Sequence, residues 1–124
     1  MRSCNSYQDI KTPEDMEYKE IFKLKEMLEK EKIPFDFRNL YDGYQICYPR
    51  NDNLKEGIFY RVCSVIEHNG SYGHNNDLLE IQGLMTKREE KETQDSVLGY
   101  LSAKDVFKRI KKHWIRSSSE IPNK

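Results

Sequence analysis

The sequence predicts an α+β fold in which a mainly antiparallel five-stranded sheet carries an N-terminal and a C-terminal helix on one face. Three observations lead to this prediction. Amphipathic stretches with helical spacing lie near both ends of the chain. Between them lie five short segments rich in β-branched and aromatic residues. Turn signals and polar connections separate these segments, so neighbouring strands are expected to pair as hairpins.

The composition fits one domain with a small core. The chain has 124 residues, of which 36% are hydrophobic and 34% are charged, and a chain of this length normally folds as one unit. Lys and Arg together number 21, as do Asp and Glu, so the formal net charge is zero. This balance argues against a nucleic-acid partner, which would favour a clearly basic chain. We expect a single domain at 14–115, a flexible arm at 1–13 and a flexible tail at 116–124.

The sequence predicts a cytoplasmic protein. No apolar run approaches the length of a membrane span, and the N-terminal MRSCNSYQDIK lacks the apolar segment of a signal peptide. Cys4, Cys47 and Cys63 are odd in number and contain no closely spaced pair. We interpret Cys47 and Cys63 as small buried residues in strands, and we expect no disulfide in a reducing compartment.

Residues 13–30 predict the N-terminal helix. Thr12 is a good N-cap, Pro13 suits the first helical position, and Asp15 follows three residues after the cap. Pro34 follows the end of the helix, because the residue before a proline avoids helical geometry. Five apolar side chains share one face of this helix: Tyr18, Ile21, Leu24, Met27 and Leu28.

Residues 35–48 predict a hairpin. Phe35 and Phe37 alternate with polar residues, as on a half-buried strand. Asp42-Gly43 is a strong signal for a two-residue turn in which both residues adopt positive φ. The return strand at 44–48 alternates tyrosine and isoleucine with other residues, and Pro49 ends it.

The next two strands, at 58–67 and 78–85, enclose the most unusual segment of the chain. The first contains the apolar and small run VCSVI, which is typical of a central strand. In the second, Gly83 marks a bulge or a close approach of two backbones. The segment between them, HNGSYGHNN at 68–76, is too long for a tight turn, so it either protrudes or folds over another part of the molecule.

The remaining residues complete the fold. In the charged connector at 86–95, Thr86 and Glu89 have the spacing of a capping box and predict one short helical turn. Residues 96–101 predict the fifth strand, and Ser102 is the expected N-cap of the last helix. The apolar stripe of that helix consists of Ala103, Val106, Phe107, Ile110 and Trp114.

Two histidines and two carboxylates belong to the 68–76 loop or flank it: Glu67, His68, His74 and Asp77. Histidine beside carboxylates can bind a metal ion or transfer protons. The separation of the histidines matches no familiar ligand spacing, so a structural loop is the default and a metal-dependent nuclease or hydrolase an alternative. A further alternative is a ligand-binding loop that uses Tyr72, His74 and Asn75, because loops on rigid scaffolds commonly carry function.

The last helix is basic, with cations at Lys104, Lys108, Arg109, Lys111, Lys112 and Arg116. Cations near a helix C-terminus are stabilised by the helix dipole, and this is the default interpretation. The functional alternative is that Lys108, Arg109 and Lys112 contact phosphates or an acidic partner surface.

The predicted sheet is rich in aromatic residues: Tyr41, Tyr44, Tyr48, Phe59, Tyr60, Tyr72 and Tyr100. Core or half-buried packing is the default for such residues. The alternative is an exposed, tyrosine-rich sheet face that binds a protein or a second copy of the chain. Because the sheet also leaves edge strands, we predict a homodimer.

Four strings, DGYQICYP, VCSVIEHNGSYG, DLLEIQGLM and VLGYLSAKDVFKRIKKHW, resemble a family of small proteins encoded by phages and prophages of Gram-positive anaerobes. The resemblance covers residues 16–114 and brings no catalytic signature with it. It implies a context in which small accessory proteins inhibit host defence systems, by docking on a protein or by sequestering a nucleotide signal.

The sequence and this resemblance together predict a non-enzymatic binding protein in the host cytosol, with a host protein as its partner. A sponge for a small nucleotide is an alternative, with Tyr72 stacking on a base and basic residues holding phosphates. The metal-dependent nuclease is another. We expect no cofactor and no membrane partner.

Overall fold

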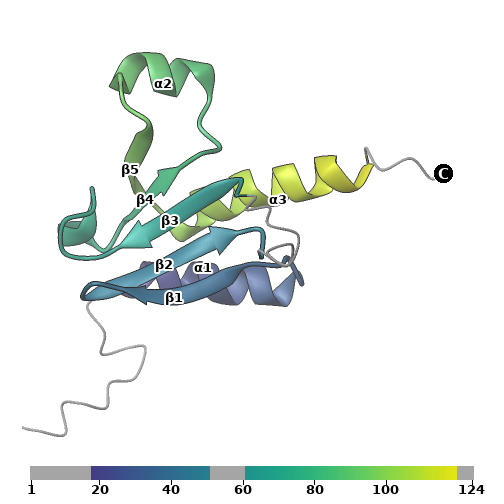
Figure 1. Cartoon of the computed structure of the whole chain (residues 1–124), viewed down its shortest axis with the longest axis horizontal. Helices are drawn as coiled ribbons and strands as arrows, with labels where there is room; N and C mark the ends of the chain where they lie inside the picture. Colours follow the sequence, from purple (N-terminus) through teal and green to yellow (C-terminus); the bar gives the residue numbers. More distant parts are fainter. Residues whose placement is uncertain (1–17, 51–60, 120–124) are drawn as a thin grey trace, which may run out of the picture.

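The computed structural model describes residues 18–50 and 61–119 (Figure 1). Three α-helices, one short 3-10 helix and five strands lie within these ranges. In chain order they are α1 (Glu20–Lys30), β1 (Asp36–Leu40), β2 (Gly43–Tyr48), β3 (Cys63–Glu67), η4 (His74–Asn76), β4 (Leu79–Gln82), α2 (Lys87–Thr93), β5 (Val97–Leu101) and α3 (Ala103–Ser119).

The five strands form one sheet in the order β1-β2-β3-β4-β5, and every neighbouring pair is antiparallel. Spatial order equals sequence order, because short connections favour pairing between consecutive strands. The predicted α+β class and five-stranded antiparallel sheet are therefore confirmed. The sheet has two edge strands, β1 and β5, and the homodimer stays a prediction.

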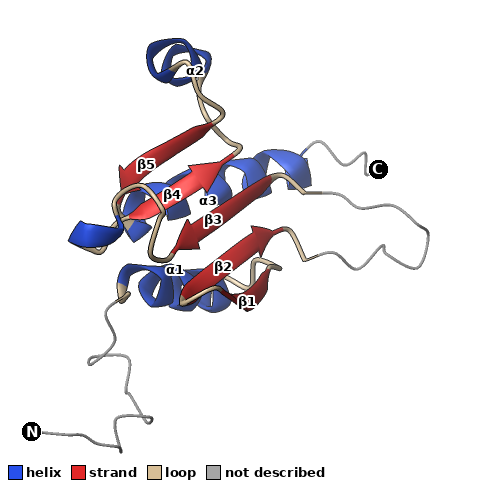
Figure 2. Ribbon diagram, turned by 60° about the vertical axis from the view of Figure 1, so that its left-hand side comes forward, coloured by secondary structure: helices blue, strands red, loops and turns tan. Residues whose placement is uncertain are grey.

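The core lies between the sheet and the two long helices. Ile46 pairs with Val65, and Val65 pairs with Ile81, so the central strands present these three buried residues on one face. Burying each such side chain contributes roughly 1.5–3 kcal/mol. Both helices lie on the same side of the sheet (Figures 1 and 2). They add six buried residues to this cluster: Ile21, Leu24, Leu28, Ala103, Val106 and Ile110.

The helix boundaries differ from the prediction at two points. α1 begins at Glu20, and Lys19 stands at its N-cap position, while the predicted cap Thr12 lies outside the described residues. α3 begins after Ser102, whose Oγ accepts a hydrogen bond from Asp105 N at 3.1 Å, as expected of the cap. It continues through Ser119, so residues 116–119 are helical although we expected a flexible tail.

None of the described helices has the length and apolarity that crossing a membrane requires.

Several predictions fall on residues that the structure does not describe. These are the arm at 1–13, Cys4, the start of the third strand at 58–60 with Phe59 and Tyr60, and the tail beyond residue 119. Within the described part, Cys47 and Cys63 are buried and free, as predicted. Burial raises the pKa of the Cys63 thiol to about 12, so this thiol stays protonated at neutral pH.

The first hairpin turns one residue earlier than predicted. Leu40 pairs with Gly43, so the two turn residues are Tyr41 and Asp42, and of these only Tyr41 has positive φ, at 57°. Gly43 instead lies in β2, where a Cβ atom would clash with the carbonyl oxygen of Glu67 on β3. The glycine is therefore required by the close approach of two strands and not by the turn.

The two tyrosines of β2, Tyr44 and Tyr48, do not form an exposed face. Tyr48 is buried in the core, and Tyr44 packs against Phe22 and Phe37 with ring centroids 4.8 and 5.5 Å away. The opposite face carries polar contacts: Gln45 accepts from Arg38 Nε at 2.9 Å and donates to Ser64 Oγ at 2.8 Å. The alternative of an exposed aromatic sheet face is therefore wrong for both of these sheet tyrosines.

Candidate functional site

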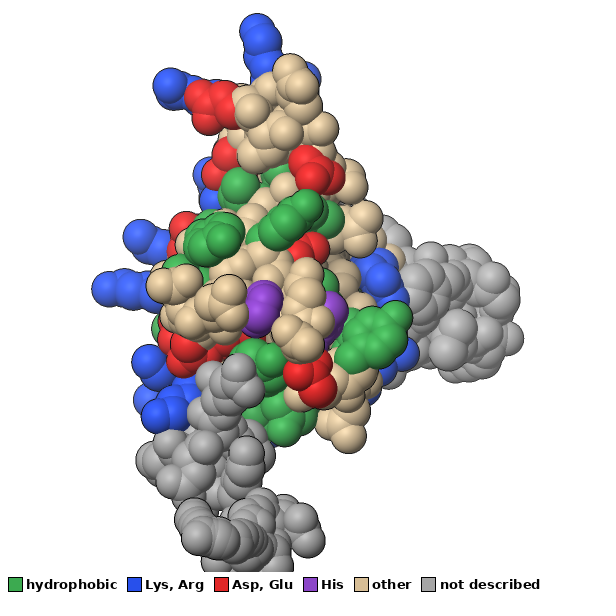
Figure 3. Space-filling model, turned by 90° about the vertical axis from the view of Figure 1, so that its left-hand side faces the viewer, with side chains coloured by type: hydrophobic (Ala, Val, Ile, Leu, Met, Phe, Trp, Pro, Cys, Tyr) green, Lys and Arg blue, Asp and Glu red, His purple; other side chains and the backbone are tan. Residues whose placement is uncertain are grey.

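The loop between β3 and β4 meets the turn between β1 and β2 and the start of α1 at one end of the molecule. Asp42 in the turn accepts hydrogen bonds from Asn69 N at 2.9 Å and from the Tyr18 hydroxyl at 3.2 Å. The Asn69 N–H is the main cause that lowers the pKa of Asp42. Figure 3 views the molecule from this end and shows hydrophobic side chains among histidine and acidic ones.

The loop is folded onto the sheet and does not protrude. Ser71 is buried, and its Oγ donates to the His68 carbonyl at 2.9 Å and accepts from His68 N at 3.1 Å. Gly73 has φ of 101°, and its carbonyl accepts from the amides of Asn76 and Leu78, both at 3.0 Å. Of the two predicted possibilities, folding over another part of the molecule is correct.

The loop packs against the edge strand β5. The Tyr72 carbonyl accepts from Tyr100 N at 3.3 Å, and the Tyr72 N–H donates to Glu80 at 2.8 Å. Gly99 passes so close that a Cβ atom there would clash with the Tyr72 side chain. The backbone on both sides of Tyr72 is therefore fixed, while its ring stays exposed.

Two carboxylates from this region cap α1. The first N–H groups of a helix have no partner within the helix, and Lys19 provides no side-chain cap. Asp77 Oδ1 accepts from Lys19 N at 2.8 Å and from Glu20 N at 3.0 Å. Glu67 Oε1 accepts from Ile21 N at 3.2 Å. The helix dipole also favours the negative charge of Asp77 at this position.

Glu67 is fully buried, and this sets its protonation. Burial, and secondarily the neighbouring Asp77, raise the pKa of its carboxyl group to about 9. At neutral pH Glu67 therefore holds a proton. A carboxyl group with no exposed surface cannot reach a substrate, so we assign Glu67 a structural role.

The four residues proposed as a metal site do not form one. Glu67 and Asp77 are turned toward α1, whereas the His68 ring packs edge-on against Tyr41 with 5.3 Å between ring centroids. In residues 18–50 and 61–119, which include all four, no group of three or more His, Cys, Asp or Glu side chains is placed to hold a metal ion. The structure therefore does not bring Glu67, His68, His74 and Asp77 together as a metal site, and the metal-dependent nuclease or hydrolase stays a prediction.

Three exposed tyrosines gather at this end of the molecule. Exposed fractions are 85% for Tyr41, 52% for Tyr72 and 64% for Tyr100, and Ile115 is the one other large hydrophobic residue in the described ranges with such exposure. Tyr41 lies beside His68, while Tyr72 and Tyr100 are joined by their backbones. We call the surface formed by Tyr41, Tyr72 and Tyr100, with His74 and Asn75, the tyrosine end.

Two of these tyrosines have a strained backbone conformation. Tyr41 has φ of 57° and Tyr100 has φ of 61°, a region that costs a non-glycine residue about 1–2 kcal/mol. Tyr100 lies where the pairing of β4 with β5 shifts register, and such a bulge redirects a side chain. Backbone strain is concentrated at functional sites in proteins, so these two residues mark the surface independently of their exposure.

The predicted binding residues fall on two separate surfaces. Tyr72 and Asn75 are exposed and His74 is half-buried at the tyrosine end, while Lys108 and Lys112 are exposed on α3. Figure 1 shows the β3–β4 loop at one end and the C-terminal half of α3 extending toward the other. The loop and the basic helix therefore do not form one site. The nucleotide sponge, which needs Tyr72 and basic residues on one ligand, stays a prediction.

Arg109, predicted as a binding residue, is used within the fold. It donates to Asp105 at 3.0 Å, to the Leu84 carbonyl at 3.0 Å and to both Glu89 oxygens at 2.9 and 2.7 Å. The guanidinium group lowers the pKa of Glu89 to about 2. Arg109 therefore anchors α2 to α3, and we leave it out of the candidate binding residues.

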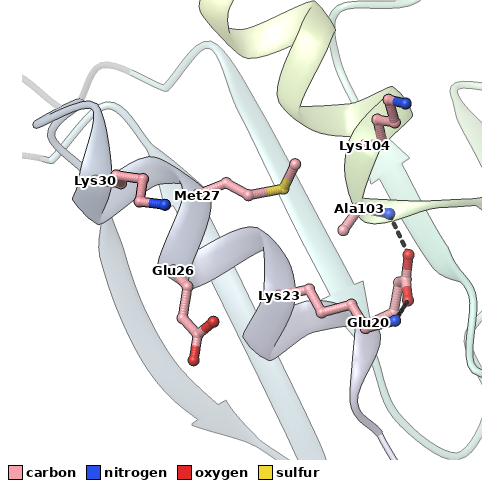
Figure 4. Close-up of a pocket in the computed structure, with 7 residues that line it drawn as sticks. All are labelled: Glu20, Lys23, Glu26, Met27, Lys30, Ala103 and Lys104. Atoms are coloured by element: carbon pink, nitrogen blue, oxygen red, sulfur yellow. Dashed lines mark hydrogen bonds and ion pairs between the residues drawn. The ribbon is translucent and has the colours of Figure 1, made fainter.

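The hollow between α1 and α3 has a volume of about 470 Å³ (Figure 4). Glu20 accepts from Ala103 N at 2.6 Å and pairs with Lys23 at 3.3 Å, so it caps α3 from the first residue of α1. Met27 lies between the two helices and Lys30 at the far end of α1. Glu20, the acidic residue of the hollow that contacts α3, is therefore already used by the fold. We assign no ligand to this hollow.

Sequence reasoning selected Tyr72, His74 and Asn75 as site residues, but it named Tyr41 and Tyr100 only among the seven aromatic residues of the predicted sheet. Tyr41 precedes a turn signal and Tyr100 follows a glycine, and neither pattern separates an exposed tyrosine from a buried one. The positive φ at both positions depends on the hairpin register and on the β5 bulge, which are set by contacts between strands.

Comparison of the chain with protein-family models, with curated proteins and with solved structures finds no match.

Proposed function

We propose that this protein is a non-enzymatic binding protein that docks on a host protein through the tyrosine end. The observation that carries the proposal is the presence of three exposed tyrosines at one end, two of them on positive-φ backbone. Following the resemblance to phage-encoded proteins, the proposed role is inhibition of a bacterial defence system, with the partner a cytosolic component of that system.

Tyrosine is well suited to such a surface. Its side chain provides a large contact area with only two rotatable bonds and a hydroxyl group that can donate and accept hydrogen bonds. Tyrosine is enriched among the residues that dominate protein–protein binding energies. The loop HNGSYGHNN adds serine, glycine and asparagine, which together with tyrosine are the residues that antibody binding loops favour.

The rigidity of the loop supports the same proposal. Its backbone is tied to β5 through Tyr72, to the first hairpin through Asn69 and to α1 through Asp77. A surface that is ordered before binding loses less conformational entropy when the partner arrives. The acidic groups that a hydrolytic site would need are meanwhile occupied in capping α1, which favours binding over catalysis.

The test uses variants that separate binding from folding. Tyr41→Gly and Tyr100→Gly remove a ring at positions where glycine relieves backbone strain, so neither variant is expected to lose stability. Proteins captured from host lysate by the wild-type chain are identified, and their affinity for each variant is measured by calorimetry. Each variant, together with Tyr72→Ala, is expected to weaken binding by about 30-fold or more.

Lys30→Ala provides the control, because it removes an exposed side chain at the last residue of α1, the end of that helix away from the tyrosine end. It is expected to bind the captured partner like the wild type. Equal affinity of the wild type and of a combined Tyr41→Gly, Tyr72→Ala, Tyr100→Gly variant would show that the docking surface lies elsewhere.

A further inference from the structure

The outer face of α3 carries an open groove of about 660 Å³. Its six lining residues follow two rows at four-residue spacing, one with Phe107, Lys111 and Ile115 and the other with Lys108, Lys112 and Arg116. Each row runs straight along the helix for two turns, roughly 12 Å. We call this surface the α3 groove.

The apolar part of the α3 groove is accessible. Ile115 is 55% exposed. Within residues 18–50 and 61–119, it is the one exposed large hydrophobic residue that lies outside the tyrosine end. Phe107 is half-buried and packs against the core, and Lys111 Nζ lies 5.7 Å from the centre of its ring. The groove thus has an aliphatic side chain at one end and a fixed aromatic ring at the other.

The charge of the α3 groove is one-sided. Four of its lining residues are cationic and none is acidic, although the whole chain has a net charge of zero. Lys111 pairs with Glu31 at 3.3 Å. Lys108 and Lys112 are exposed and form no ion pair with any residue of the described ranges. By contrast, Arg109 on the neighbouring face is neutralised by Glu89 and Asp105.

We propose that the α3 groove binds an acidic amphipathic segment of a partner protein. An aliphatic or aromatic side chain of that segment packs on Ile115 and Phe107, and its carboxylates lie against Lys108 and Lys112. Helices commonly bind in this way, with apolar anchors one or two turns apart and complementary charges beside them. The inference goes beyond the proposed function, because this surface lies away from the tyrosine end and uses none of its residues.

Two other anionic partners fit the groove less well. Phosphate contacts alone would engage the lysines but would leave the exposed Ile115 unused. A helix that lies on a membrane needs a broad apolar face, and the apolar stripe of α3 at Ala103, Val106 and Ile110 is already buried in the core. An acidic protein segment is the partner that uses both the exposed isoleucine and the unpaired lysines.

The experiment measures fluorescence anisotropy of a labelled synthetic peptide with the full chain. The peptide has roughly 15 residues, long enough for helix formation, with leucines at helical spacing among glutamates. Its matched control contains the same residues in an order without that spacing. We expect the amphipathic peptide to bind, and its affinity to fall at least about tenfold between about 50 and 500 mM salt.

Three variants locate the site. Lys108→Glu with Lys112→Glu, and separately Ile115→Ser, are each expected to weaken peptide binding at least about tenfold. Lys104→Glu, on the same helix but outside the groove, and Tyr72→Ala are expected to leave the affinity unchanged. The Tyr72→Ala result keeps this proposal separable from the proposed function.

Three results would overturn the inference. One is equal binding of the two peptides, since that would reflect charge alone. Another is unchanged affinity in the Ile115→Ser variant. The third is tighter binding of a DNA oligonucleotide or of anionic phospholipid vesicles than of the peptide, with the same dependence on Lys108 and Lys112.

Discussion

Replacing Glu67 with glutamine should stabilise the protein, by an amount that grows as pH rises. The carboxyl group is fully buried and its pKa is raised to about 9 from an ordinary value of 4.5. Between these values the folded chain must bind a proton that the unfolded chain has released. The free energy of unfolding therefore falls by about 1.36 kcal/mol for each pH unit in this range.

The size of the effect follows from these two values. The contribution of protonated Glu67 to the free energy of unfolding is fully present below pH 4.5, and it is lost progressively as pH rises toward 9. At pH 7 the loss is about 3 kcal/mol. Glutamine does not titrate, and it keeps an oxygen that can accept from Ile21 N. The stabilisation by Glu67→Gln should therefore be close to zero near pH 4 and about 3 kcal/mol at pH 7.

Urea unfolding at several pH values, followed by circular dichroism, measures this difference. Glu26→Gln is the control, because Glu26 is an exposed residue of α1, the helix that Glu67 caps, and we expect it to leave the pH dependence of stability unchanged. If Glu67→Gln is no more stable than the wild type at pH 7, or if its advantage is the same at every pH, Glu67 is ionised in the folded protein and the reasoning fails.

Four other expectations can be checked directly. Tyr41→Gly should raise the free energy of unfolding by about 1 kcal/mol, whereas Tyr72→Gly, at a residue without positive φ, should lower it; thermal unfolding compares the two. Arg109→Ala should destabilise the protein by roughly 2–3 kcal/mol, and hydrogen exchange should show that the amides of α2 lose protection. Unchanged protection of α2 in this variant would exclude the anchoring role of Arg109. Gly43→Ala should destabilise by more than about 2 kcal/mol, because its methyl group would clash with β3, and a neutral result would mean that the strands can move apart. Sedimentation at micromolar concentration should show a dimer, and a monomer at every concentration would contradict the predicted self-association.

Local patterns predicted most of the fold. The helical stripes of α1 and α3 and the alternation in the strands depend on neighbours a few residues apart, and so does the capping box. In the structure Thr86 Oγ1 accepts from Glu89 N at 3.0 Å and Glu89 accepts from Thr86 N at 2.9 Å, as predicted. Ser102 likewise caps α3. These contacts span only three residues, so the sequence alone can reveal them.

The failed predictions depend on contacts between distant residues. The sequence predicts that Gly43 is a turn residue, but glycine is required there because the backbone of β3 leaves no room for a Cβ atom. Glu67 and Asp77 were considered as metal ligands, but they cap α1 over separations of 46 and 58 residues. A carboxylate that caps a distant helix has the same local sequence as one that binds a metal ion. The tertiary arrangement is needed to tell them apart.

The capping of α1 has a consequence for how the chain assembles. The helix has no side-chain cap of its own and begins on oxygens supplied by Asp77 and Glu67, while its first residue, Glu20, accepts from Ala103 N and joins Ser102 in capping α3. Each helix start is thus completed by an element far away in the chain. A peptide containing α1 alone would be a poor helix, and the first turns of both helices should form together with the β3–β4 hairpin in a single cooperative step.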